Sequence, residues 1–219
     1  MSEIIYLSNV RASFPHIAEP QRQRTASGTE RVSYNTDLVM EPDHPGFAQF
    51  MQRFGQLALE RMKENAQAVM NMIQNDRKAR CYGRGEEKVS KKTFQPYDGY
   101  MGMVFITAGR DTMPQMIQPD GTPVDPANTM ASMALARKIY GGCRVNVAIK
   151  PWWQNANAEK QYGYGIRCDL LAIQFAGDDK PFGEAAPDVS NVFGAVATQA
   201  AAPVAAAPVM PLPPFMMGQ

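Results

Sequence analysis

The order of apolar and polar residues predicts strands near the start of the chain. Over residues 3–14, and again over residues 31–40, apolar and polar side chains alternate, which is the period of a half-buried β-strand. Pro15 and Pro20 are expected to end the first strand. The polar residues between the two strands, 21–30, predict a flexible hairpin loop.

The spacing changes in the next part of the chain. Between residues 47 and 73, apolar side chains recur at intervals of three and four residues, which predicts one long amphipathic helix with its apolar face on the core. A third strand is expected over residues 97–107, where glycines permit a bend. Proline and glycine predict a loop over residues 113–128, and a short helix is expected over residues 129–139.

A hairpin over residues 140–175 is the strongest pattern in the chain. Apolar and polar residues alternate over residues 144–151, and a returning strand follows over residues 166–175. Trp152 and Trp153 are the only tryptophans, and they lie at the loop end of the first strand. Adjacent residues on a strand point to opposite faces, so one of the two indoles is expected to pack inward.

Trp152 is the tryptophan that we expect at the surface. It shares the parity of Lys150 on the predicted strand, and a lysine side chain favours the exposed face. Arg167 on the returning strand adds another positive charge. The hairpin therefore offers flat aromatic faces beside cations. Single-stranded nucleic acid requires this combination, because each base needs a stacking surface and each phosphate needs a counter-charge.

The most basic window covers residues 76–92, with seven basic and three acidic side chains. A solvated loop that keeps the protein soluble would explain such a charge run. Tyr82 lies inside the window, and Phe94, Tyr97 and Tyr100 follow it, so the same segment also suits contact with phosphates and bases. The pattern alone leaves both interpretations open.

Composition predicts one folded domain with a tail. The chain has 219 residues, of which 45% are hydrophobic, enough to bury a core. Residues 189–219 carry no charge and are rich in alanine and proline. We therefore predict a folded domain over residues 1–183 and a disordered tail over residues 184–219. The apolar end of the tail suits either a peptide that docks on a partner or a purely flexible end.

The charge balance and the reactive residues exclude several classes of site. Residues 1–175 carry 21 basic and 17 acidic side chains, a mild excess that does not by itself establish a nucleic-acid binder. Three separated cysteines and two histidines lack the spacing of a metal site, and no nucleotide-binding or hydrolase motif occurs. We expect no metal, no cofactor and no enzymatic activity. No leader or long apolar run is visible, so we expect a cytoplasmic protein without a membrane partner.

Four short segments form a recognisable set, and they read SFPHIAEP (13–20), YGGCRVN (140–146), IQF (173–175) and PFG (181–183). In order and spacing, from about residue 3 to residue 183, the chain resembles a family of tailed-phage single-stranded DNA-binding proteins with an OB-fold. The resemblance implies an α+β fold built on a five-stranded OB barrel with long hairpin loops. It also implies sequence-independent binding of single-stranded DNA in phage DNA replication, recombination or repair, inside the infected bacterial cell.

The predicted binding site combines aromatic and basic side chains of the hairpin, the basic window and the residues that follow the window. We expect base stacking from an aromatic set: Tyr82, Phe94, Tyr97, Tyr100, Trp152, Trp153, Tyr162 and Tyr164. We expect phosphate contacts from a basic set: Arg77, Lys78, Arg80, Arg84, Lys91, Lys92, Lys150 and Arg167. Two alternatives stay open, a phage structural or protein-interaction module that docks a protein on the aromatic hairpin, and a recombination mediator that anneals strands. The sequence does not fix the number of subunits, and a homo-oligomer agrees with it.

Overall fold

Seven strands form one sheet in the part of the chain that the computed structural model describes, residues 3–24, 28–156 and 163–183. The strands are β1 (Ile5–Arg24), β2 (Glu30–Met40), β3 (Tyr82–Arg84), β4 (Val104–Arg110), β5 (Gln115–Ile117), β6 (Arg144–Gln154) and β7 (Gly165–Gly177). Their order in the sheet is β3-β4-β2-β1-β6-β7-β5, and the β5–β7 pair is parallel. All described residues belong to the first of two units, Met1–Ala185. The predicted disordered tail, residues 184–219, lies outside the described residues.

The predicted five-stranded barrel is not confirmed, because the sheet has seven strands and its hydrogen-bonded order is open. The additional strands β3 and β5 have three residues each, too few to produce a periodic pattern in the sequence. β7 and β4 are not hydrogen-bonded neighbours in this order, but a short segment that includes Ala79 and Cys81 contacts both. In this segment the backbone oxygen of Ala79 accepts a hydrogen bond from the N–H of Ile166, with an N–O distance of 2.8 Å. The oxygen of Cys81 accepts one from the N–H of Thr107 at 2.6 Å.

β1 is longer than the pattern predicted and continues through both prolines to Arg24. Its pairing with β2 shifts register between Ser13 and His16 and again between His16 and Gln21. The prolines lie in these irregular stretches, where the missing backbone N–H removes no regular ladder bond. The prediction that the prolines end the strand was therefore wrong.

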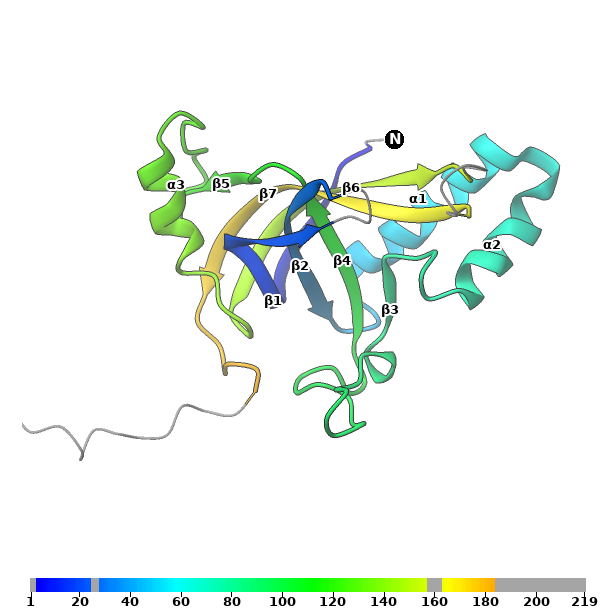
Figure 1. Ribbon diagram of the computed structural model, residues 1–219, viewed down its shortest axis with the longest axis horizontal. Coiled ribbons are helices and arrows are strands. Elements are labelled where there is room, and N and C mark those ends of the chain that lie inside the picture. The colour runs from blue at the N-terminus through cyan, green and yellow to red at the C-terminus, as the bar shows by residue number, and fades with distance from the viewer. Residues whose placement is uncertain (1–2, 25–27, 157–162, 184–219) are drawn as a thin grey trace, which may run out of the picture. The chain divides into compact units, whose positions relative to one another are not determined.

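The single helix predicted over residues 47–73 is divided into two. The helical segments are α1 (Pro45–Met62), a 3-10 turn (Lys63–Asn65) and α2 (Ala66–Asn75). Lys63 has a φ of 48°, outside the helical region. The chain changes direction here (Figure 1), and Phe54 of α1 and Ile73 of α2 are both buried in one core. Periodicity did not reveal the break, because apolar residues recur at helical spacing on both sides of it.

The hairpin of β6 and β7 confirms the predicted alternation. The inward-facing side chains Val147 and Ile149 of β6 are buried, as are Ile166 and Leu170 of β7. They share one hydrophobic core with the buried faces of α1 and α2. This core covers one face of the hairpin and leaves Lys150 and its neighbours of the same parity on the other face.

Residues 97–103 form turns and not the start of the predicted third strand. Gly99 and Gly102 have φ values of 76° and 75°, a left-handed conformation that interrupts a strand, and β4 begins after them. The helix α3 (Thr129–Ala136) lies within the helix predicted over residues 129–139. None of the helices in the described ranges is both long enough and apolar enough to cross a membrane.

Candidate nucleic-acid interface

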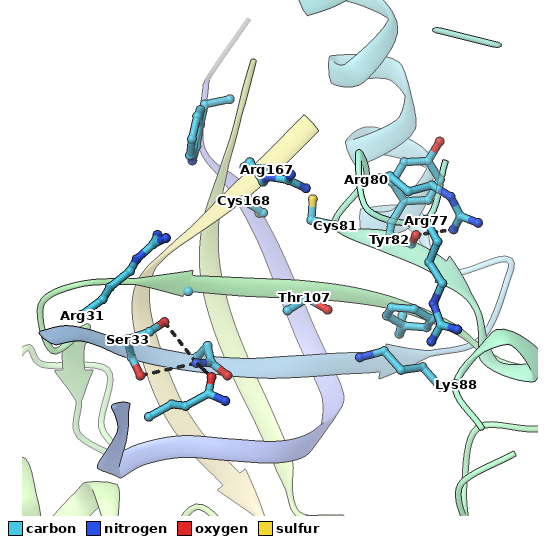
Figure 2. Close-up of a pocket in the computed structure, with 15 residues that line it drawn as sticks. Arg31, Ser33, Arg77, Arg80, Cys81, Tyr82, Lys88, Thr107, Arg167 and Cys168 are labelled. Atoms are coloured by element: carbon cyan, nitrogen blue, oxygen red, sulfur yellow. Dashed lines mark hydrogen bonds between the residues drawn. The ribbon is translucent and has the colours of Figure 1, made fainter. Parts of the chain in front are cut away.

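A cleft of about 450 Å³ is lined by residues of β2, β4, β6 and β7 and of the segment around Arg77 to Lys88 (Figure 2). We call it the basic cleft, because five cationic side chains line it: Arg31, Arg77, Arg80, Lys88 and Arg167. Among the described residues no carboxylate lines the cleft. Uncharged polar and aromatic side chains complete the lining. A cleft with this composition has a positive potential that attracts anions.

Alternate residues of two neighbouring strands form the floor of the basic cleft. Arg31, Ser33 and Asn35 of β2 all line it, as residues two apart on a strand share one face. Gly109 of β4 pairs with Asn35, and a Cβ atom at Gly109 would lie 2.6 Å from the Cβ of Asn35. Glycine at position 109 therefore permits the close approach of the two strands and leaves the floor open.

Trp152 lies at the edge of the basic cleft in a fixed orientation. Its side chain is 39% exposed, and its Nε1 donates a hydrogen bond to Oδ1 of Asp169 at 2.8 Å. Arg167 is its cross-strand partner in β7. Because the hydrogen bond orients the indole before any ligand arrives, stacking a base on the ring would cost little conformational entropy.

The prediction that Trp152 is the exposed tryptophan is confirmed. Trp153 is only 7% exposed, and its ring centroid lies 6.4 Å from that of Phe54 in α1. Tyr164 packs against the same indole with a centroid distance of 6.1 Å. In this arrangement Trp153 presents no free face to a base and contributes instead to the core.

Arg167 is held beside Trp152 by two hydrogen bonds. Its Nε donates to Oε1 of Gln154 at 2.9 Å, and its Nη2 donates to the backbone oxygen of Lys78 at 2.8 Å. A guanidinium has five N–H donors, so further donors stay available to an anion. An oriented arginine beside an oriented indole can bind a phosphate next to a stacked base.

The other four cations of the basic cleft fall into two pairs. Arg80 and Lys88 each form an ion pair of 2.7 Å with a carboxylate that lies outside the lining. The side chains of Arg31 and Arg77 form no hydrogen bond or ion pair with the described part of the chain. A phosphate can therefore bind Arg31 and Arg77 without displacing a protein partner.

The base of the cleft adds no negative charge at neutral pH. Burial raises the pKa of the Cys81 thiol to about 12 and raises the pKa of Cys168 well above its ordinary value. Burial also raises the pKa of the Tyr82 hydroxyl to about 12. Within the described ranges no group of three or more His, Cys, Asp or Glu side chains is placed to hold a metal ion.

The structure brings a subset of the predicted binding residues together at the basic cleft. The members of this subset are Arg77, Arg80, Tyr82, Trp152 and Arg167. Tyr82 is largely buried against Phe50 and presents little ring surface to the cleft. Lys78 is exposed beside the cleft, since its carbonyl accepts the bond from Arg167.

The remaining predicted residues lie elsewhere. Lys91 and Lys92 at the end of the basic window are exposed, as is Phe94 just after it. Arg84 lines a neighbouring pocket, and Tyr97 lines a separate cleft. Lys150 forms an ion pair with Glu3, with a distance of 2.5 Å. Tyr100 is fully buried, so its ring has no face available for stacking. Tyr162 lies outside the described residues.

Sequence analysis missed Arg31, Asn35 and Lys88 as lining residues. Arg31 and Asn35 have the polar parity of the strand predicted over residues 31–40, so the alternation contained a signal for them. The alternation did not predict that the cations of the basic window would lie beside this face of the strand. That depends on how distant segments pair, which local periodicity does not specify.

Comparisons with known proteins point to one family. The sequence profile described as the single-stranded DNA-binding protein of Enterobacter phage Enc34 matches residues 3–202. A solved structure of the single-stranded DNA-binding protein from bacteriophage Enc34 is 26% identical, with a TM-score of 0.57 over 87% of this chain and 89% of that chain. The structure of that protein in complex with single-stranded DNA is also 26% identical, with a TM-score of 0.58 over 83% and 90%. Putative protein p50 of Acyrthosiphon pisum secondary endosymbiont phage 1 is 26% identical over 185 residues, 81% of this chain and 85% of the relative.

Proposed function

Because the chain belongs to the family of the Enterobacter phage Enc34 single-stranded DNA-binding protein, we propose that it binds single-stranded DNA of any sequence. In this role it coats and protects exposed strands during phage DNA replication, recombination or repair, and it performs no chemistry on them. The tail that follows the folded domain is proposed to recruit replication or recombination proteins.

The observation that carries the proposal is the basic cleft with Trp152 at its edge. Arg31, Arg77 and Arg167 supply donors for phosphates, and the oriented indole of Trp152 supplies a stacking face. Phosphate contacts and base stacking both tolerate any base, because every nucleotide has a phosphate and a flat ring. These contacts therefore support binding without sequence preference.

A second opening suggests the path of the strand. A neighbouring cleft of about 690 Å³ shares Arg31, Ser33, Gly109 and Trp152 with the basic cleft. It adds one cation, Arg110, and three carboxylates, Glu30, Asp111 and Asp169. Trp152 therefore borders both clefts. We propose that an extended DNA strand passes over Trp152, stacks one base on its indole and continues into a cleft on each side.

The arrangement of the longer strands supports an OB-like barrel. Leaving out β3 and β5, five strands remain, and the segment that includes Ala79 and Cys81 hydrogen-bonds to both β7 and β4. We propose that this segment closes the sheet into a five-stranded barrel. OB barrels bind oligonucleotides across one sheet face and its flanking loops, and the basic cleft occupies such a face.

The function is tested by titrating the full chain with fluorescein-labelled oligo-dT at several salt concentrations and measuring anisotropy. We expect tight binding at low salt, weakening linearly in log–log form by about 0.7 per phosphate contact, and little binding to duplex. Trp152→Ala should weaken binding by about 5- to 150-fold, the loss of one stacked base.

Tyr6→Ala is the matched control, because Tyr6 is an aromatic residue 60% exposed on β1 that does not line the basic cleft. It should bind like the wild type. If the wild type fails to bind single-stranded DNA at low salt, the proposed function is wrong. The aromatic hairpin would then be a surface for docking a protein.

A further inference from the structure

A separate cleft, of about 360 Å³, has an almost entirely apolar lining. Its walls include the aromatic side chains Phe14, Tyr97 and Phe182, and we call it the apolar cleft. Asp98 is the only charged side chain that lines it among the described residues. No described cation belongs to this lining, and the Arg11 guanidinium, 4.0 Å from the centroid of the Phe182 ring, is already paired with Asp179. A phosphate would therefore be repelled by the Asp98 carboxylate. A flat uncharged ring, in contrast, could stack on the aromatic walls.

The apolar cleft lies on the same face of the sheet as the basic cleft. Ser13 of β1 pairs with Asp37 of β2, and Asp37 pairs with Thr107 of β4, so the three side chains form one row on that face. Ser13 lines the apolar cleft, whereas Thr107 lines the basic cleft. Ser13 and Asp37 are buried, and Lys88 and Tyr100 contact the Asp37 carboxylate. A DNA strand that occupies the basic cleft would therefore pass over these side chains to reach the apolar cleft.

Phe14 presents its ring to the apolar cleft from a strained backbone. Its φ of 47° is rare for a bulky residue and falls in the irregular stretch of β1. The side chain is 45% exposed, and its ring meets that of Tyr97 edge to face at a centroid distance of 4.8 Å. Backbone strain combined with an exposed aromatic ring is typical of a binding site.

We propose that the apolar cleft binds one nucleobase of the strand held in the basic cleft, stacked against Phe14. This inference rests on the proposed function. A nucleobase is the expected occupant of the apolar cleft for two reasons: the cleft shares a sheet face with the basic cleft, and its lining suits an uncharged ring. The loop that carries Tyr97 also exposes Lys91 and Lys92, which can neutralise phosphates outside the apolar lining while a base enters it.

The test compares affinities for oligo-dT of increasing length in the full chain and in its variants Phe14→Ala and Phe14→Leu. Phe14→Leu keeps an apolar wall but removes the flat ring. Short oligonucleotides that fill only the basic cleft should bind all three proteins equally. Above the length at which the wild type gains affinity, both variants should bind about 5- to 150-fold more weakly. Oligo-dT that carries single 5-iododeoxyuridine substitutions should form photo-crosslinks with Phe14 or Tyr97 in the wild type.

Tyr6→Ala again serves as the control, because Tyr6 lies on the same strand as Phe14 but lines neither cleft. It should show the same gain with length as the wild type. Equal affinities of the wild type and both Phe14 variants at every length, or crosslinks only to other residues, would overturn this inference and leave the proposed function intact. Absence of any binding by the wild type would instead overturn the proposed function.

Discussion

Asp37 is a buried carboxylate beside the basic cleft, and its replacement should destabilise the fold strongly. The carboxylate is 4% exposed and accepts three hydrogen bonds. The donors are Nζ of Lys88 at 2.7 Å, the hydroxyl of Tyr100 at 2.8 Å and Oγ1 of Thr107 at 2.5 Å. Burial and the Asp37 carboxylate both raise the pKa of Tyr100, so its hydroxyl stays a donor.

The magnitude follows from the burial of each donor that Asp37→Ala would leave without an acceptor. Tyr100 is fully buried, so leaving its hydroxyl without an acceptor should cost about 2 kcal/mol of folding free energy. Thr107 is half-buried and should add about 1 kcal/mol. The Lys88 side chain is 25% exposed and can turn to water, so its lost ion pair adds only about 0.5 kcal/mol. The expected total of about 3.5 kcal/mol is a large part of the 5–15 kcal/mol that typically stabilises a domain.

Urea unfolding followed by circular dichroism measures this loss as a change in the free energy of unfolding. Asp37→Asn should lose about half as much as Asp37→Ala, because the amide keeps one oxygen acceptor but carries no charge. A loss below about 1 kcal/mol for Asp37→Ala would refute the argument, as would equal losses for the two variants.

Two further predictions concern charge. Arg31→Ala should weaken DNA binding and reduce the slope of log affinity against log salt by about 0.7, whereas Lys150→Ala, which removes a cation already paired with Glu3, should leave the slope unchanged. Titration of both variants at three salt concentrations measures the slopes. Equal slopes would contradict the proposal that Arg31 contacts a phosphate whereas Lys150 does not. Folding should also weaken at alkaline pH. Burial holds the pKa of the Cys81 thiol at about 12, against an ordinary value of 9.0. The stabilisation that comes from burying the neutral thiol is therefore complete below pH 9.0 and decreases as the pH rises toward 12. Cys81→Ala should therefore lose less stability than the wild type between pH 8 and pH 10 in urea unfolding, by at most about 1.4 kcal/mol per pH unit; identical pH dependence would be inconsistent with a buried thiol.

Local periodicity was sufficient for the main hairpin, in which each strand has one buried face and one exposed face. The hairpin of β6 and β7 follows its alternation, and the parity argument correctly placed Trp152 outside and Trp153 inside. The same reasoning failed for the first strand and the long helix. β1 accommodates its prolines in register shifts, and the helix breaks at Lys63 with no change in apolar spacing. Both features depend on what each segment packs against.

The sequence by itself determined the α+β character of the chain, its main hairpin and the coexistence of cations with aromatic residues, because these properties depend on residue type and on spacing of two or about four residues. Only the tertiary structure decided which of these residues meet. Arg31, Arg77 and Arg167 come from distant parts of the chain and line one cleft, whereas Lys150 pairs with Glu3 and Tyr100 is buried on Asp37. Side-chain chemistry is local, but strand register and burial are set by contacts between segments far apart in sequence, and these assemble the site.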